Sequence, residues 1–515
     1  MRWHPRSKHL AILGGLILFV ALSLMQHYNL VTADLGRHIV NGRELWSHPE
    51  LLSTNFYSCT HTTYTFVNHH WLYGVMVYGV SQVFGMGSLT LLNMLLGASA
   101  FSLVLLLSYK KSGFGPALIA GFLAIPPITS RVEVRPELVS MLGLAIYLVV
   151  LTLYSKKQLS FIKTASILLL TQLVWQNAHL FFVFGLVVLF LFWIESLLLQ
   201  KKQHIQKLGV LGIVSGLLVL VNPNGIAGAM QPFTIFENYG YRVAENQTLW
   251  FMISRFANPE HIYLAILLLA VATLCIPVFT QKEIKQYFLP IALFLVFGFL
   301  ALQVIRTRSF FGLISIYSIA SLLPVSYLLA KPYIEKMRKQ EGWYFVLSPL
   351  IFIGFVLIIG SGLFRPISSL TGIGPLPKVD AAANFITTNK LQGPIFNNYD
   401  IGGYLIFYLY PEKVYVDNRP EAYPAAFFTD DYIVPQENPA EWKRLQQQYD
   451  FNLIVFNRLD LTPWGQAFLI ARIQDSDWTP VFVDEQVIIF LSNRPENAEL
   501  TKKLALPKEL FSYSQ

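Results

Sequence analysis

About eleven apolar runs, each close to the length of a membrane-spanning helix, constrain this chain more than any other feature. They cover approximately residues 10–30, 88–108, 114–130, 137–154, 161–176, 179–199, 208–222, 261–279, 287–304, 309–329 and 343–363. A helix of about 20 apolar residues crosses the hydrocarbon core of a bilayer. The composition, 54% hydrophobic and 13% charged, lies outside the soluble globular norm. We therefore predict an all-α membrane bundle of about 11 transmembrane helices.

The first apolar run resembles a signal peptide in its flanks but not in its length. The basic segment MRWHPRSKH precedes LAILGGLILFVALSLM, and no small-x-small cleavage site follows. We therefore predict an uncleaved first span. The amphipathic stretch Leu72–Phe84 predicts a helix at the membrane interface, with an extra span as the alternative.

The positions of the lysines predict how the bundle is oriented. Cytoplasmic loops are enriched in Lys and Arg, so Arg2, Arg6 and Lys8 place the N-terminus in the cytoplasm. Alternating spans then put the lysine-rich loops on the same side, at Lys110/Lys111, Lys156/Lys157, Lys201/Lys202/Lys207, Lys282/Lys285 and Lys331/Lys336/Lys339. The opposite loops contain no lysine and hold other polar groups, at 131–136, 177–179, 222–225, 241–250 and 306–308. The polar groups of the bundle therefore gather at its outer end, where they either form a site or are simply the polar ends of helices.

The composition changes after Gly362. Residues 1–363 are predicted to form the multi-spanning domain, whose first outer loop covers 31–87. Residues 364–378, rich in Gly, Pro and Ser, form a linker. We predict that residues 379–515 form a soluble α/β domain on the outer side. Its apolar patterns indicate helices at Val379–Asn389 and Pro439–Tyr449 and strands at Val414–Asp417, Leu453–Phe456 and Val487–Leu491. From Leu376 onward the chain has 12 Lys and Arg and 18 Asp and Glu, a net charge of −6. Because the whole chain has a net charge of +8, the residues before Leu376 have a net charge of +14.

Asp34 follows the first span directly and begins a polar outer loop. A carboxylate at the edge of the bilayer can serve as a general base. An equally weighted interpretation is that Asp34 caps the N-terminus of a short helix, Leu35–Leu45. The two roles are compatible, and we take Asp34 as the candidate catalytic residue.

Four histidines lie in the same loop, at His38, His61, His69 and His70. His38 comes four residues after Asp34, so the two would share one face of a helix. The spacing matches no standard zinc pattern, and the sequence leaves a divalent metal ion open without a clear motif for one. His38 and His70 are candidate substrate-binding residues, while an aromatic belt at the membrane interface is the alternative for His69-His70-Trp71.

Four arginines on the lysine-free side are candidates for binding an anion: Arg131, Arg135, Arg306 and Arg308. Guanidinium groups bind phosphate oxygens well, and a lipid phosphate is the natural anion at this depth. The alternative is internal pairing, for example with Glu133 or Glu245. Asn177 and His179 are further candidates for binding sugar or phosphate, although a simple turn explains them as well.

In the C-terminal part, polar residues cluster in NNYDIGGYLIFY and VYVDNRPEAY. Asp400, Asp417, Arg419 and Glu421 are expected near strand ends, where loops of α/β domains often hold ligands; an Asp–Arg pair that fixes the loop is the favoured alternative. GxGxxG, GKS/T, GxSxG and HExxH motifs are absent from the sequence. No basic patch with interleaved aromatics indicates nucleic acid.

Short motifs along the chain form a recognisable series. The first outer loop holds Asp34-Leu35-Gly36, His38, Gly42 and His70-Trp71-Leu72. Then come Arg135-Pro136, Trp175-x-Asn177-x-His179, Asn222-Pro223-x-Gly225, Arg308, Gly402-Gly403-Tyr404 and Asp417-x-Arg419. Over nearly its whole length the chain resembles the GT-C superfamily of membrane glycosyltransferases, and more narrowly a group of bacterial multi-spanning proteins in or near it. Two departures are Arg37, where an aromatic is common, and the lack of the Asp-x-Asp or Glu-Asp pair of metal-dependent members.

This resemblance implies transfer of a hexosyl or pentosyl group from a polyprenyl-phosphate donor to a glycan, lipid or protein acceptor. The reaction would occur at the outer face of a bacterial plasma membrane, among membrane lipids. Asp34 would deprotonate the acceptor, and some of the four arginines would hold the lipid phosphate. Two other functions remain open: a transporter or flippase for a lipid-linked or anionic substrate, and a non-catalytic membrane assembly protein that works through its C-terminal domain.

Overall fold

The structure is a computed structural model that describes residues 5–511 except 131–132, 237–238, 257, 282–283, 339–361, 365–367 and 369. Seven helical stretches of this part are long and apolar enough to cross a membrane: Arg6–Leu24, Gly87–Ser112, Glu137–Ser155, Leu180–Leu198, Pro259–Phe279, Ile284–Gln303 and Ile305–Leu328. They contain α1 (Pro5–Leu24), α4 (Gly87–Ser112), α6 (Glu137–Ser155), α8 (Val183–Leu198), α12 (Pro259–Cys275), α13 (Phe288–Gln303) and α14 (Arg308–Arg338). The protein is thus a multi-pass helical membrane protein.

Three further apolar windows of the sequence are also helical: α5 (Phe114–Thr129), α7 (Phe161–Ala178) and α9 (Lys202–Leu218). The predicted span 343–363 lies almost entirely outside the described residues. The first span ends six residues earlier than predicted, because the chain leaves the helix after Leu24 to pair with the linker. The Leu370 carbonyl accepts the His27 amide at 2.7 Å, and the Tyr28 carbonyl accepts the Leu376 amide at 2.9 Å.

Helix α14 forms the centre of the bundle. Its spanning part is the most buried of the seven, and it packs against α4, α5, α12 and α13. The surrounding core is aliphatic and aromatic, with Phe101, Phe297 and Phe310 fully buried. Apolar side chains that face outward along α9 and α12, such as Ile213 and Ile266, are suited to contact with lipid.

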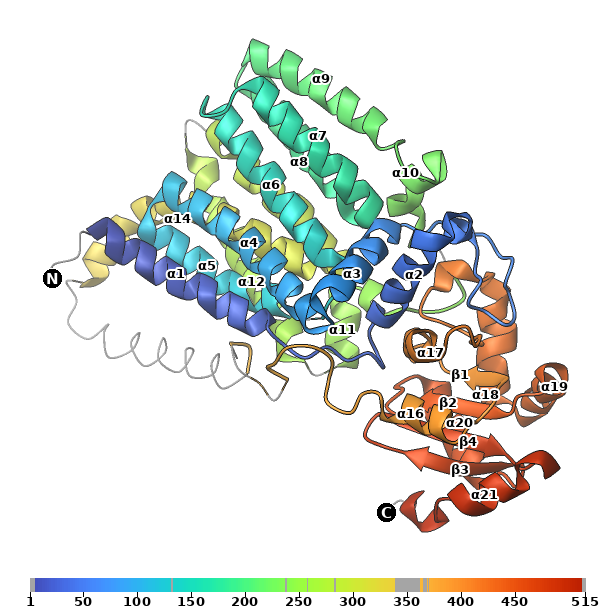
Figure 1. Ribbon diagram of the computed structural model, residues 1–515. Coiled ribbons are helices and arrows are strands. Elements are labelled where there is room, and N and C mark those ends of the chain that lie inside the picture. Colours follow the sequence, from blue (N-terminus) through green and yellow to red (C-terminus); the bar gives the residue numbers. More distant parts are fainter. Residues whose placement is uncertain are drawn as a thin grey trace.

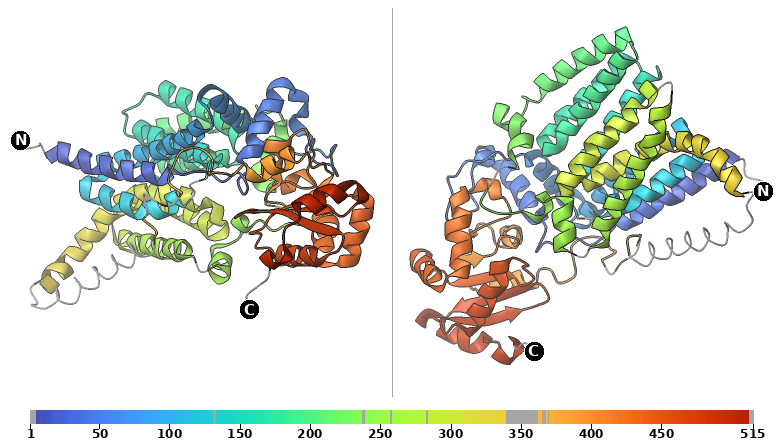
Figure 2. Two further views of the ribbon diagram at one scale, coloured as in Figure 1. Left: turned by 60° about the horizontal axis from the view of Figure 1, so that its bottom comes forward. Right: turned by 180° about the vertical axis from the view of Figure 1, so that it is seen from behind.

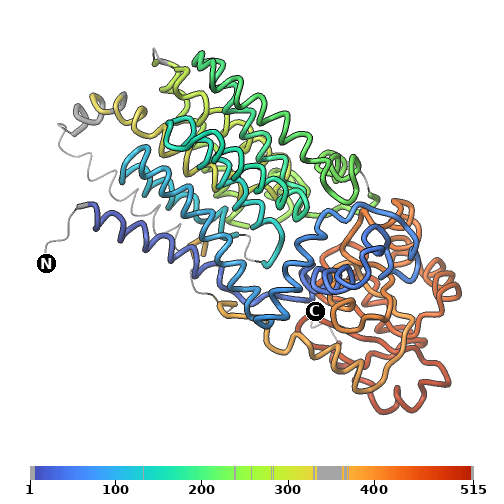
Figure 3. Tube along the Cα trace, turned by 45° about the horizontal axis from the view of Figure 1, so that its top comes forward, coloured from blue at the N-terminus to red at the C-terminus, as the bar shows by residue number. Residues whose placement is uncertain are grey.

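The N-terminus and the C-terminal domain lie at opposite ends of this bundle, in the view of Figure 1 and in both views of Figure 2. Two short helices of the first outer loop, α2 (Leu35–Ser47) and α3 (Trp71–Phe84), lie between the bundle and the C-terminal domain, as the chain trace in Figure 3 also shows. Helices α10 (Gly225–Thr234) and α11 (Leu249–Arg255) flank the same end.

Helices α2 and α3 pack with almost no space between their backbones. A Cβ atom built on Gly42 would lie 2.1 Å from the Gly74 carbonyl oxygen, and one built on Gly74 would lie 2.9 Å from the His38 carbonyl oxygen. The obstacle at Gly42 is backbone, which cannot move aside as a flexible side chain would. This contact holds the helix that begins at Asp34.

We expect Gly42→Ala to destabilise the protein by roughly 1–3 kcal/mol, because the added methyl group forces α2 and α3 apart. Thermal unfolding of the protein in detergent measures the effect. The matched control is Gly79→Ala on α3, where a Cβ would meet nothing within 4 Å and alanine favours the helix. Equal melting temperatures for the two variants would contradict the close approach.

The C-terminal domain contains a four-stranded sheet in the order β1-β2-β4-β3. Its strands are β1 (Ile395–Asn397), β2 (Leu453–Asn457), β3 (Trp478–Val483) and β4 (Val487–Ser492). β1 and β2 are parallel, with Ile395 opposite Leu453, and the other pairs are antiparallel. Around the sheet lie α16 (Ala381–Thr388), α17 (Gly402–Leu409), α18 (Val434–Glu437), α19 (Pro439–Tyr449), α20 (Pro463–Gln474) and α21 (Ala498–Leu504). The two strand predictions at β2 and β4 and the two helix predictions at α16 and α19 are confirmed to within two residues.

The predicted strand Val414–Asp417 is wrong. Val414 bridges Ser58 of the first outer loop instead of joining the sheet. Its amide donates to the Tyr57 carbonyl at 3.0 Å, and its carbonyl accepts the Cys59 amide at 2.9 Å. The segment has an apolar sequence because it is buried. Its pairing with residues 57–59 fastens the C-terminal domain to the first outer loop.

Candidate active site

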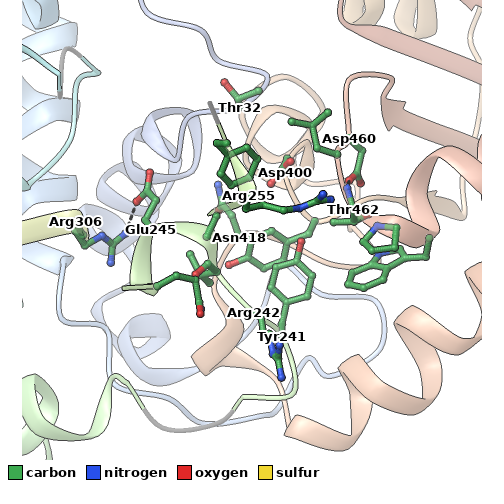
Figure 4. Close-up of a pocket in the computed structure, with 18 of the residues that line it drawn as sticks. Thr32, Tyr241, Arg242, Glu245, Arg255, Arg306, Asp400, Asn418, Asp460 and Thr462 are labelled. Carbon is green, nitrogen blue, oxygen red and sulfur yellow. Dashed lines mark hydrogen bonds and ion pairs between the residues drawn. The ribbon is translucent and has the colours of Figure 1, made fainter. Parts of the chain in front are cut away.

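A cavity of about 660 Å³ lies where the first outer loop, the bundle and the C-terminal domain meet. Several separate segments of the chain line it. They contribute Thr32 and Asp34; Arg135; residues 240–245 with Gln247, Phe251, Arg255, Phe256 and Arg306; and Tyr399, Asp400, Asn418, Ile433 and 460–464. Figure 4 shows the labelled polar side chains gathered around one space. Of the candidates predicted from sequence, Asp34, Arg135, Arg306 and Asp400 line it.

Asp34 is oriented by the C-terminal domain. It occupies the N-cap position of α2, as the alternative interpretation expected, but its side chain makes no capping hydrogen bond. Instead Asp34 Oδ1 accepts a hydrogen bond from the Asn418 amide, and Asn418 Oδ1 accepts one from Arg37 Nε at 3.0 Å. Asn418 was not among the residues we expected, because nothing in the sequence links it to a residue so far upstream.

The segment that carries Asn418 is held by a buried ion pair. Arg419 donates to both oxygens of Asp417, at 2.7 and 2.6 Å, and to Asn55 Oδ1 at 2.7 Å. Both charged side chains are almost completely buried. The interpretation of Asp417 and Arg419 as a pair that fixes the loop describes this geometry, and the loop it fixes presents Asn418 to Asp34.

The close packing of α17 against the segment that carries Asn418 completes this arrangement. A Cβ on Gly402 would lie 2.4 Å from the Val416 carbonyl oxygen, so only glycine fits at this point of the Gly402-Gly403-Tyr404 motif. The neighbouring Glu421 is half-buried, and this burial raises the pKa of its carboxyl group. Glu421 does not line the cavity.

Arg135 and Arg306 reach the cavity as members of an ion-pair network. Arg135 contacts Glu133 at 2.5 Å and Glu245 at 2.9 Å. Arg306 contacts Glu245 at 3.2 Å and Glu137 at 3.3 Å. The expected internal pairing is therefore present, and an anion would have to compete with Glu245 for both guanidinium groups.

Of the other two predicted arginines, the structure describes only Arg308. Arg131 lies outside the described residues. Arg308 contacts Glu260 at 3.3 Å and donates to the Ser130 carbonyl at 3.0 Å, and it is not a lining residue of the cavity. Its role in the structure is to join α12, α14 and the end of α5.

Arg255, which the sequence reasoning missed, lines the cavity at the end of α11. It is exposed, and no carboxylate of the described chain lies within 4.0 Å of its guanidinium group. Figure 4 shows its side chain extending toward Thr462 and Asp460. The signal that could have found it is its position on the lysine-free side of the bundle. Arg242 is also at the cavity.

The predicted ligands His38, His70, Asn177 and His179 are packed behind α2 and are not lining residues of the cavity. The His38 ring meets those of His70 and Tyr73 edge-on, at 5.2 Å each, and His70 stacks on His179 at 5.2 Å. Burial, reinforced by Arg37, holds the pKa of His38 well below its ordinary value, so this ring is neutral. Asn177 accepts from Trp71 Nε1 at 3.1 Å and donates to the Val221 carbonyl at 3.1 Å.

This geometry therefore does not support direct contact between these four residues and a substrate in the cavity. They connect α2 and α3 to the bundle, and His179 also contacts Ser140 Oγ at 2.6 Å. Within the described residues, no group of three or more His, Cys, Asp or Glu side chains is arranged to hold a metal ion.

Asp400 and Asp460 follow the carboxyl ends of the parallel strands β1 and β2, where ligands of α/β domains commonly bind. Both line the cavity. Burial, with the nearby charges of Asp460 and Asp34, raises the pKa of the Asp400 carboxyl to about 7. Asp460 was missed because its segment, NRLDLTPWG, reads as an ordinary turn followed by a helix.

Neither a protein-family model nor a curated protein matches the sequence significantly. Solved structures do match the fold. The archaeal oligosaccharyltransferase AglB from Archaeoglobus fulgidus, in complex with an inhibitory peptide and a dolichol-phosphate, has a TM-score of 0.61 at 11% identity, over 93% of this chain and 74% of that one. ArnT from Cupriavidus metallidurans, bound to undecaprenyl phosphate, has a TM-score of 0.54 at 13% identity, over 98% and 100%.

Both of these proteins are GT-C glycosyltransferases. The chain therefore has the GT-C fold, a helical membrane bundle with a soluble C-terminal domain, and the fold class predicted from the sequence is confirmed.

Proposed function

We propose that this protein is an integral membrane glycosyltransferase that transfers a sugar from a polyprenyl-phosphate donor to an acceptor on the extracytoplasmic face. One observation supports the proposal: Asp34 and an exposed guanidinium group, that of Arg255, line one cavity at the end of the GT-C bundle that faces the C-terminal domain. A carboxylate and a cation at the same cavity can serve the two charges that develop when a sugar leaves a phosphate.

Asp34 is placed to accept the proton of the attacking hydroxyl. Its Oδ1 is held by Asn418, and its Oδ2 has no hydrogen-bond partner among the described residues. In the transfer, the acceptor oxygen forms a bond to the anomeric carbon, and the bond from that carbon to the phosphate oxygen breaks. The proton passes to Asp34, and the electron pair of the broken bond remains on the lipid phosphate.

Arg255 is our candidate for holding that phosphate. Arg135 and Arg306 already share Glu245, whereas Arg255 has no such partner in the described chain. Its helix also presents large apolar side chains to the outside, Trp250 and Phe251. An isoprenoid chain lying along α11 would bring its phosphate to the arginine at the end of the helix.

We expect Arg255→Ala to weaken binding of a short-chain polyprenyl phosphate by about 10- to 100-fold, since a hydrogen-bonded ion pair contributes about 1.5–3 kcal/mol. The measurement is a lipid titration of the protein in nanodiscs. The control is Arg458→Ala, which removes an exposed arginine of the C-terminal domain that does not line this cavity. Unchanged binding by Arg255→Ala, or an equal loss in the control, would refute this assignment.

The same variants test the proposed reaction. Donor turnover should fall with Arg255→Ala and remain at the wild-type rate with Arg458→Ala. Binding of the lipid phosphate without any turnover of a lipid-linked sugar, across a range of acceptors, would count against an enzyme and in favour of a transporter.

A further inference from the structure

The two sides of the cavity differ in chemistry. All the guanidinium groups at the cavity come from the bundle side, where the carboxylates Asp34 and Glu245 also lie, whereas the side formed mainly by the C-terminal domain carries aromatic rings and carboxyl groups without a cation. Tyr241 stacks on Tyr399 with ring centroids 4.3 Å apart and an angle of 25° between planes. Trp464 stands edge-on to Tyr241 at 6.3 Å. These three residues, which we call the aromatic floor, all line the cavity.

The polar groups beside the aromatic floor are of two kinds. Asp460 is already satisfied, because it accepts from the Thr462 amide at 2.8 Å and from Asn398 Nδ2 at 2.9 Å. Trp464 Nε1 is buried and has no hydrogen-bond partner, and no side-chain hydrogen bond of the half-buried Asp400 occurs within the described part of the chain. Buried polar groups normally have partners, so an indole N–H left without one at a cavity wall indicates that a ligand supplies it, and the Asp400 carboxyl beside it is available to the same ligand.

A sugar ring matches this combination. One face of a pyranose ring presents C–H groups that pack on a flat aromatic surface, and its edge presents hydroxyls that both donate and accept hydrogen bonds. Aromatic side chains offer large contact area with a polar tip. The Asp400 carboxyl, whose pKa is raised to about 7 by burial and by Asp460 and Asp34, can donate as well as accept near neutral pH.

Two other acceptor classes fit less well. A cationic acceptor would have to bind next to Arg255, whose guanidinium group has no carboxylate within 4.0 Å in the described chain. A peptide is commonly recognised by adding a strand to the edge of a sheet, but the described lining residues lie in loops and helices and none lies on a strand. A neutral ring with hydroxyls meets neither obstacle.

We propose that this side of the cavity is the acceptor subsite and that the acceptor is a neutral sugar ring, stacked on Trp464, bordered by Tyr241 and hydrogen-bonded by Asp400. The inference rests on the proposed glycosyl transfer and names the acceptor class for it. The cavity volume of about 660 Å³ is in the range of small-molecule sites, about 300–1,000 Å³. Because Asp34 lines the same cavity, a hydroxyl of the stacked ring can face the proposed base.

The test is binding of three probes to the full chain in nanodiscs, observed by saturation-transfer NMR: neutral methyl hexosides, a methyl hexosaminide with a free amine, and a short peptide. We expect the neutral hexosides to bind best. Trp464→Ala should weaken their binding at least fivefold, and Trp464→Phe, which keeps a ring, should restore most of it. The control is Trp46→Ala, since Trp46 is 74% exposed and lies outside the cavity.

Variants at a second position, Asp400, test the inference independently of any misfolding caused by Trp464→Ala. Asp400→Ala should weaken hexoside binding, while Asp400→Asn, which still donates and accepts, should retain it. Stronger binding of the amine or of the peptide, no binding of any hexoside, or hexoside binding unaffected by both Trp464→Ala and Asp400→Ala would each overturn the inference.

Polyprenyl phosphate binding, measured on the same samples, separates this inference from the proposed function. If the lipid phosphate binds and no hexoside does, only the acceptor class is wrong. If the wild-type protein does not bind the lipid phosphate, the proposed transfer itself fails.

Discussion

Replacing Asp34 with asparagine is expected to lower the rate of sugar transfer by about 10²- to 10⁴-fold, the range for loss of a general base. The amide keeps the shape of the side chain and a carbonyl oxygen that can still accept from Asn418. It cannot accept the proton of the acceptor hydroxyl. The change should therefore reduce the maximal rate while binding of polyprenyl phosphate stays close to the wild-type level, and both are measured on purified protein in nanodiscs.

The matched control is Glu50→Gln, which neutralises a carboxylate in the same outer loop that is 68% exposed. It should leave the transfer rate unchanged. Asn418→Ala should fall between the two, because Asp34 keeps its charge but loses the group that orients it. If Asp34→Asn transferred sugar at the wild-type rate, the base would have to be another residue.

Removing Arg419 is expected to produce the largest loss of stability outside the membrane. Its partner Asp417 is 0% exposed and Arg419 itself is 4% exposed. Deleting one member of a buried ion pair leaves an uncompensated charge and costs about 3–5 kcal/mol. Arg419→Ala should therefore lower the free energy of unfolding by this amount, as measured by denaturation of the protein in detergent.

The control is Arg494→Ala, whose partner Asp450 is 76% exposed; surface pairs contribute about 0–1 kcal/mol. A double variant, Asp417→Asn with Arg419→Leu, should recover part of the loss, because no charge is left buried without a partner. Similar losses for Arg419→Ala and Arg494→Ala would show that the pair does not fasten the C-terminal domain to Asn55 of the outer loop.

Helices of the bundle were predictable because hydrophobicity along the chain is a local property. Ten of the eleven apolar windows coincide with helices, and the remaining one lies almost entirely outside the described residues. In the C-terminal domain, β2 and β4 have continuous apolar sequences, whereas β1 has only three residues and β3 contains Pro480. Both were missed because their periodic signal is too short or is interrupted.

The candidate site was predictable only in part, because the cavity is assembled from distant segments. Asp34 stands out locally as an acid next to a span. Asp34 and Asn418 are 384 residues apart, and no local pattern in either segment predicts their hydrogen bond. His38 shares the helix of Asp34 as expected, yet it faces α3 rather than the cavity, since the packing of α2 on α3 decides which side of the helix is buried. Arg255 was overlooked because it ends a short helix outside the predicted spans.

The proposed function requires that the phosphate of the lipid binds in the cavity that Asp34 and Arg255 line. Its most direct test is an electron cryomicroscopy structure of the protein in a nanodisc with a short-chain polyprenyl phosphate. We predict phosphate density within hydrogen-bonding distance of the Arg255 guanidinium group, on the same cavity wall as Asp34, with the isoprenoid chain beside Trp250 and Phe251. Phosphate density anywhere outside this cavity, for example at the His38–His70 cluster, would contradict the claim.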